Sequence, residues 1–166
     1  DHEGCKKLTK KRADKLRIGF SIDGDILISH KASIGYSCIV EYAKPYVMLT
    51  PQVTLYRVNK EMIIPEYLLY FFQQYSFQKL TEAYAKQSTR NYIGITNQKK
   101  LWIYLPRTIE EQTEIVEPIK TIDASIFDKR SKVESLKVLK KSLMQNLLSG
   151  KKRVDAEKIN RLLNQS

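Results

Sequence analysis

The sequence predicts an α+β protein in which a mixed α/β domain is followed by one long helix. Two changes in the residue pattern along the 166-residue chain support this prediction. Residues 19–42 are rich in β-branched and aromatic residues, and Gly24 and Gly35 mark turns between them, which is typical of consecutive short strands. After Pro106, glycine is absent until Gly150 and apolar residues recur at steps of four and three. That spacing is typical of a long, coiled-coil-forming helix.

The first part of the mixed domain combines a basic segment with strands. Residues 5–17 are rich in Lys and Arg and contain no Gly or Pro, so they predict a short basic helix that leads into the core. After the first strands, residues 52–58 predict a further strand because Val, Leu and Tyr alternate there with polar residues.

The second part of the mixed domain is predicted to be mainly helical. Pro65 suits the first turn of a helix, and apolar residues recur at helical spacing from there to Tyr75. Residues 76–85 predict a second helical piece, and residues 87–94 predict an irregular polar loop. Residues 99–106 predict a last strand that ends at Pro106.

Residues 108–150 predict a single helix. Thr108, followed three residues later by Glu111, fits a capping box at its start, and Gly150 fits its end. Pro118 lies near the first turns and is compatible with a kink. A helix of about 40 residues reaches about 60 Å at 1.5 Å per residue, which is longer than a small domain needs. Its apolar seam therefore predicts pairing with another helix, rather than packing inside the same domain. The seam residues are Ile115, Ile119, Ile122, Ile126, Val133, Leu136, Leu143 and Leu147.

Composition restricts the class of partner. The chain carries 29 Lys and Arg against 18 Asp and Glu, a net charge of +11, which favours polyanions such as nucleic acid. No long apolar stretch predicts a membrane-spanning helix. Cys5 and Cys38 are too few for a disulfide framework, so we expect a reducing, cytoplasmic setting. Because the chain begins with Asp1, we expect it to be a piece of a longer protein.

The residue patterns of DNA-modifying catalysis are missing from the sequence. It contains no Glu-x-Lys of the common restriction nucleases, and no Pro-Pro or Gly-x-Gly segment of an adenine methylase. His30 has no metal-ligating neighbours at suitable spacing and is expected to be a polar loop residue. Asp23 and Asp25 flank Gly24, as expected of a turn between strands. We therefore predict no catalytic residue and no metal site.

Residues that suit DNA binding are abundant. Arg matches guanine, and Asn and Gln match adenine, in the major groove, whereas Lys neutralises phosphates. The alternative is that these residues merely belong to solvated loops and a solvated helix face. The candidates for base contact are Ser29, His30, Lys31, Ser33, Gln87, Ser88, Thr89, Arg90, Asn91 and Tyr92. The candidates for phosphate contact are Lys6, Lys7, Lys10, Lys11, Arg12 and Lys15, with Thr96, Asn97, Gln98, Lys99 and Lys100.

The order of several segments resembles the specificity subunit of type I restriction-modification systems. These segments are GDILISHKASIG, PYVMLTPQVTLYRV, IPEYLLYFFQQY, QSTRNYIGITNQKKLWIYLPRTIEEQTEIVEPIKTIDASI and LKKSLMQNLLSGKKRV. The most specific piece is the passage from Leu105-Pro106 into Glu111-Gln112, followed by the long helix and the Leu148-Ser149-Gly150-Lys151 close.

The resemblance implies a target recognition domain with a curved sheet over residues 1–107. A spacer helix that docks methylase subunits would follow over 108–150, and a basic tail over 151–166. In that family a recognition domain reads one half of a split DNA site, and two such units are joined by antiparallel helices. This chain has one unit, so it looks like a half-subunit or a carboxy-terminal half. A half-subunit would pair with itself or with a second half through the seam.

The resemblance also implies recognition without catalysis. Methylase subunits would supply DNA methylation with S-adenosylmethionine, and a restriction subunit, associated indirectly, would use ATP and Mg²⁺. This chain itself would need no cofactor. One alternative is the recognition domain of a fused restriction-methylation enzyme with catalytic domains upstream, and another is a structural coiled-coil adaptor without a DNA role.

Overall fold

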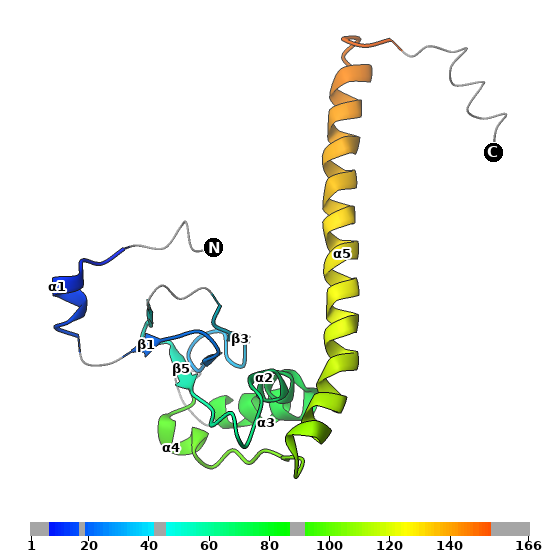
Figure 1. Ribbon diagram of the computed structural model, residues 1–166. Coiled ribbons are helices and arrows are strands. Elements are labelled where there is room, and N and C mark those ends of the chain that lie inside the picture. The colour runs from blue at the N-terminus through cyan, green and yellow to red at the C-terminus, as the bar shows by residue number, and fades with distance from the viewer. Residues whose placement is uncertain (1–6, 17–18, 42–45, 87–91, 154–166) are drawn as a thin grey trace. The chain divides into compact units, whose positions relative to one another are not determined.

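A computed structural model describes residues 7–16, 19–41, 46–86 and 92–153. The chain divides into two compact units, Asp1–Glu117 and Pro118–Ser166. The first unit contains short strands and helices, and the second is the main part of one long helix (Figure 1). The α+β class predicted from the sequence is confirmed.

The strands of the first unit form two small antiparallel sheets. β1 (Phe20–Ser21) pairs with β4 (Val47–Met48). β2 (Ile26–Ser29) is the central strand of the other sheet, between β3 (Ser37–Ile39) and β5 (Val53–Tyr56). The predicted strand at 52–58 is therefore confirmed, with slightly shorter bounds.

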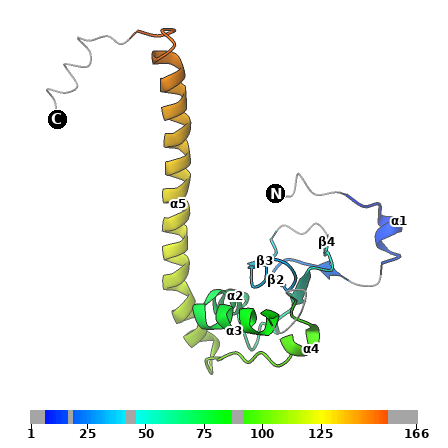
Figure 2. The same ribbon diagram turned by 180° about the vertical axis from the view of Figure 1, so that it is seen from behind.

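Among the helices of the first unit, α2 packs on the three-stranded sheet and α3 lies beside α2 (Figure 2). α1 (Lys10–Ala13) is a single turn, so the predicted basic helix is much shorter than residues 5–17 among the described residues. α2 (Pro65–Gln73) packs on β2 and β3 and against α3 (Tyr75–Lys86), as predicted for both helices. α4 (Ile95–Gln98) is a further short helix.

The core lies between the sheet and α2. Alternation along β2 buries Ile26 and Ile28 completely or nearly so, because successive strand side chains point to opposite faces. Opposite them, α2 contributes Leu68 and Phe72, and the Phe72 ring stacks on Phe77 of α3 with ring centroids 4.9 Å apart. Burial of these large apolar side chains is the main stabilising contribution to the unit.

Residues 99–106 do not form the predicted strand. Lys99 and Lys100 form a turn after α4, and residues 101–106 have no regular secondary structure and pair with no strand of the described residues. Leu101 and Leu105 face the core, whereas Trp102 and Tyr104 are 71% and 69% exposed. The prediction of a strand is wrong, because alternation alone cannot tell a paired strand from an irregular segment that packs every other side chain on a core.

The long helix α5 (Ile109–Leu147) is confirmed and continues through Pro118. At its start, the backbone N–H of Glu111 donates to Thr108 Oγ1 at 3.2 Å, and the Glu111 carboxylate accepts from the backbone N–H of Arg107. The second contact reaches one residue further back than in a standard capping box. Gly150, with φ +70°, follows the end of the helix. In the part of the chain that the structure describes, no helix is long and apolar enough to cross a membrane.

The first turns of α5 belong to the core of the first unit. Gln112 is fully buried: its Nε2 donates to the Met62 carbonyl at 2.9 Å, and its Oε1 accepts from the Ile64 backbone N–H at 3.0 Å. Val116 is buried beside it. The compact unit therefore extends to Glu117, beyond the predicted domain boundary at residue 107.

Candidate nucleic-acid interface

The turn between β2 and β3 presents polar side chains on a tightly bonded backbone. The Ser29 backbone N–H donates to the Tyr36 carbonyl at 2.8 Å, and the Gly35 N–H donates to the Ser29 carbonyl at 2.9 Å. Ser29 Oγ donates to the Ser33 carbonyl and accepts from the Tyr36 N–H. These bonds fix the turn from within, while Lys31 and Ser33 remain exposed.

A glutamine of α3 also supports this turn through hydrogen bonds. Gln78 Nε2 donates to the Gly35 carbonyl at 2.9 Å and to the Phe72 carbonyl at 2.5 Å. Gly35 has φ +88°, and a Cβ atom there would force the end of the Gln78 side chain to move from its present position. The position therefore requires glycine both for its backbone conformation and for the close approach of Gln78.

His30 joins the turn to two other segments. Its Nδ1 lies 2.7 Å from Thr54 Oγ1 of β5, and its backbone carbonyl accepts from the Ile93 N–H at 3.0 Å. Its ring meets the edge of Tyr92 with centroids 5.3 Å apart. Burial lowers the pKa of His30 below its usual value, since the charged imidazolium would lose hydration there.

Three stretches of chain therefore meet at His30. An isolated antiparallel bridge joins Lys31 to Tyr92, which places the end of the predicted polar loop beside the β2–β3 turn. The two regions predicted to contact bases are thus brought together where the structure describes them. Among the residues predicted to contact bases, those exposed at this junction are Lys31, Ser33 and Tyr92.

Other predicted DNA-binding residues have different surroundings. Ser29 and His30 are engaged inside the fold. Gln98 is buried, and its amide donates to the Ile93 carbonyl and accepts from the Tyr56 hydroxyl, so it supports the loop instead of facing outward. Asn97 is half-buried. The predicted residues that are exposed are Lys7, Lys10, Lys11, Arg12, Lys15, Thr96, Lys99 and Lys100. Those that lie outside the described residues are Lys6, Gln87, Ser88, Thr89, Arg90 and Asn91.

Asp25 has a role that sequence reasoning missed. Its carboxylate accepts two hydrogen bonds from the Arg57 guanidinium, both at 2.7 Å, and one from the Ile22 N–H at 2.8 Å. The Arg57 hydrogen bond lowers the pKa of this carboxyl below its usual value. The pair ties the turn before β2 to the end of β5, so Asp25 is structural. Residues this far apart in the chain give no local signal of such a contact.

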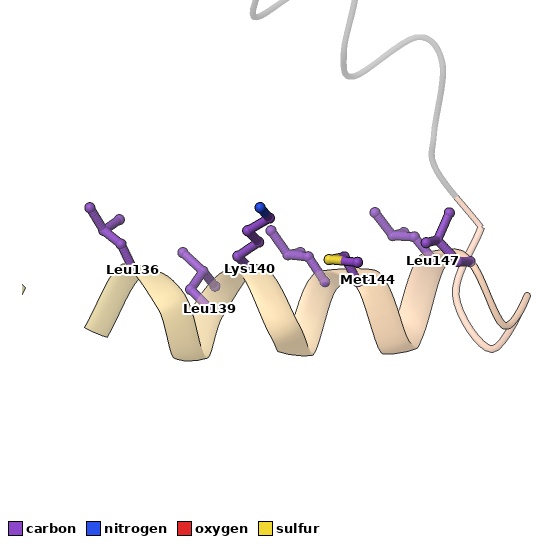
Figure 3. Close-up of a pocket in the computed structure, with 7 residues that line it drawn as sticks. Leu136, Leu139, Lys140, Met144 and Leu147 are labelled. Atoms are coloured by element: carbon purple, nitrogen blue, oxygen red, sulfur yellow. The ribbon is translucent and has the colours of Figure 1, made fainter. Parts of the chain in front are cut away.

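The described residues contain no cluster of three or more His, Cys, Asp or Glu side chains that could hold a metal ion. Along α5, the predicted seam is exposed except at half-buried Ile119. Towards the end of the helix, Leu136, Leu143 and Leu147 line an open apolar hollow (Figure 3). Leu139 and Met144 widen it on either side of the seam.

Comparison with known proteins gives a family match that includes residues of both units. Residues 9–138 match the model of the type I restriction modification DNA specificity domain, a match that includes the β2–β3 turn and most of α5. The chain belongs to this family. The resemblance predicted from the segment order is thereby confirmed.

Relatives of this specificity-domain protein support the same assignment. A protein named as the type I restriction enzyme MjaX specificity subunit of Methanocaldococcus jannaschii is 33% identical over 132 residues, which is 77% of this chain and 31% of the relative. A chain in a solved structure, described as concerning complex assembly and conformational transition of the type I R-M system, shares the fold. Its TM-score is 0.59 at 24% identity, covering 79% of this chain and 32% of that one. The specificity-domain protein thus spans about a third of the length of these relatives.

Proposed function

We propose that the chain is the DNA-recognition part of a type I restriction-modification specificity subunit. It would read one half of a bipartite target and hold methylase subunits, without catalytic activity of its own. The family match over residues 9–138 is the observation that supports this proposal, because it covers the strands and helices of the first unit together with most of α5. S-adenosylmethionine, ATP and Mg²⁺ would be used by the partner subunits.

The base-reading surface is the junction around His30. Lys31, Ser33 and Tyr92 are exposed there on a backbone that is fixed by hydrogen bonds, so their side chains would meet DNA in a defined geometry. A fixed geometry matters because a bidentate or well-directed contact to one base edge discriminates by about 1–3 kcal/mol.

The proposal is tested with the full chain and a randomised duplex DNA library. Selection should enrich one short sequence, and Lys31→Ala should weaken binding to that sequence by about 5- to 100-fold, the equivalent of one base contact. Lys60→Ala, an exposed lysine outside the junction, is the matched control and should bind as the wild type does. Failure to enrich any sequence would contradict base reading. An equal effect of both variants would indicate general charge attraction instead.

The spacer role requires α5 to pair with a second helix. Its residues 109–128 carry six acidic and one basic side chain, and residues 129–147 carry six basic and one acidic. The helix dipole favours such a distribution only within the terminal turns, whereas here it extends over both halves. Two copies placed antiparallel would bring acidic halves against basic halves, which supports the antiparallel arrangement expected of the family.

A further inference from the structure

We infer that two copies of α5 pair in one particular register, in which the two-fold axis passes beside Ser131. This inference rests on the proposed antiparallel pairing and adds to it the layer in which each seam residue is buried. The layers join Lys129 to Val133, Ile126 to Leu136, Ile122 to Lys140, Ile119 to Leu143, and Ile115 to Leu147 of the second copy.

The register follows first from the extent of the apolar seam. Seam positions are of two kinds, one followed by a step of three residues and the other by a step of four. In an antiparallel pair, each kind faces the other kind in successive layers, so the pairing can shift only in steps of one heptad, which is seven residues. Lys129 and Lys140 occupy the two remaining positions of the same four-and-three spacing. The proposed register is the one in which all ten positions, from Ile115 to Leu147, face one another. Described residues 120–145 are all exposed in the single chain, so the apolar seam residues in this range need a partner to cover them. The proposed register covers all of them.

A shift of one heptad towards the start of α5 is excluded by Gln112. That register would place Leu143 against Gln112 and Leu147 against Thr108 of the second copy. Gln112 is fully buried, and its amide already bonds to the Met62 carbonyl and the Ile64 N–H. Gln112 therefore cannot turn outward to cover Leu143. Leu147 would face the short polar side chain of Thr108, so both leucines would remain uncovered.

A shift of one heptad in the other direction is excluded by charge. It would place Lys129 of each copy directly against Lys140 of the other, twice in the pair. Two ammonium groups facing each other in an apolar seam repel and lose hydration together. In the proposed register each lysine faces an aliphatic residue instead and can extend its charged end into water.

The apolar hollow near the end of α5 fits the proposed register. Leu136, Leu143 and Leu147 line the hollow, and in this register they receive Ile126, Ile119 and Ile115 of the second copy. The hollow would therefore form holes for isoleucine knobs.

The charges beside the seam partly favour and partly oppose this register. Asp123 of each copy would flank Lys137 of the other, an attractive contact made twice. Arg130 and Lys132 would each meet their own counterparts near the two-fold axis. These long side chains are exposed and can turn apart into water, where salt screens them, whereas uncovered leucines have no such relief.

Disulfide trapping in the full chain tests the register. Cys5 and Cys38 are replaced by Ser, and pairs of cysteines are introduced into α5. Ile126→Cys with Leu136→Cys, and independently Ile119→Cys with Leu143→Cys, should give covalent dimers under mild oxidation. A disulfide requires Cα atoms within about 7 Å. Two cysteines ten residues apart in one helix are about 15 Å apart and cannot join within a chain.

Two further variants represent the neighbouring registers. Ile122→Cys with Val133→Cys would crosslink after the shift towards Gln112, and Ile126→Cys with Leu143→Cys after the shift that opposes the lysines. Dominant crosslinking of either would overturn the inference. Self-crosslinking of the single variant Ile126→Cys would overturn it as well, since it indicates parallel helices.

Light scattering before oxidation separates the register from the pairing beneath it. A monomer at that stage would contradict self-pairing and the register together. A dimer that crosslinks in another register would contradict the register alone. The DNA selection described above is independent of both results.

Discussion

At the scale of single residues, His30 connects three segments of the first unit. It is buried, and it connects the β2–β3 turn to β5 through Thr54 and to Ile93 through its carbonyl. Neither connection could be predicted, because sequence gives no sign of which residues lie beside a histidine 24 positions away from its partner. The exposure of Lys31 and Ser33, in contrast, follows from their place in a turn. Their contact with bases stays a prediction.

Burial of His30 makes stability depend on pH. Because burial makes the pKa of His30 lower in the folded chain than its usual value, the unfolded chain binds the proton more readily. Stability due to this group is therefore complete above about pH 6.5 and is lost as the pH falls below that value. We expect the free energy of unfolding, measured with urea between pH 7.5 and 5, to fall more steeply in the wild type than in His30→Asn. Equal slopes would contradict the prediction.

At the scale of elements, α5 was predicted closely and the segment before it was not. The helix has a periodic pattern over ten turns and clear signals at both ends, so local rules suffice. Residues 99–106 have the alternation of a strand, but whether such a segment pairs depends on a neighbour that local rules do not reveal. In the structure, Leu101 and Leu105 pack on the core while no described strand lies alongside.

The seam of α5 gives a prediction about mass in solution. Each aliphatic residue buried in the pair contributes about 1.5–3 kcal/mol, whereas an exposed ion pair contributes at most about 1 kcal/mol. Ile122→Asp or Leu136→Asp should therefore convert a dimer into a folded monomer by light scattering, with an unchanged circular dichroism signal from the first unit.

Val138→Asp is the matched control for the seam. Val138 is 64% exposed and lies about 200° around the helix from Leu136, away from the seam. This variant should keep the mass of the wild type. If it also dissociates the pair, the helix contact involves another face, and the seam assignment is wrong.

At the scale of the whole molecule, the net charge of +11 favours binding to polyanions such as DNA. Exposed Lys10, Lys11 and Arg12 contribute a local group of cations in the first unit. Positive charge attracts DNA phosphates without reading the base sequence. This attraction can be predicted from composition alone, whereas the individual contacts at the His30 junction cannot.

The salt dependence of DNA binding measures this contribution. The logarithm of the binding constant should fall linearly with the logarithm of salt concentration, and each lost phosphate contact should reduce the slope by about 0.9. Replacing Lys10, Lys11 and Arg12 by Ala should therefore flatten the slope while leaving the selected sequence unchanged. Lys79→Ala is the control because Lys79 already pairs with Glu82 at 3.0 Å. A slope that the triple variant leaves unaltered would exclude these residues from phosphate contact.

The contact between Gln78 and Gly35 limits how new DNA specificities can be built on this scaffold. A turn transplanted from a relative would bring its own side chains, but α3 of this chain would still present Gln78 to its backbone. Any residue other than glycine at position 35 would be strained at φ +88° and would also force the end of the Gln78 side chain to move. Loss of the glutamine would leave the Gly35 carbonyl without this partner, at a cost of about 1–3 kcal/mol if the group stays buried. Grafting should therefore exchange the turn together with position 78, so that the β2–β3 turn and the α3 residue that supports it are transferred together.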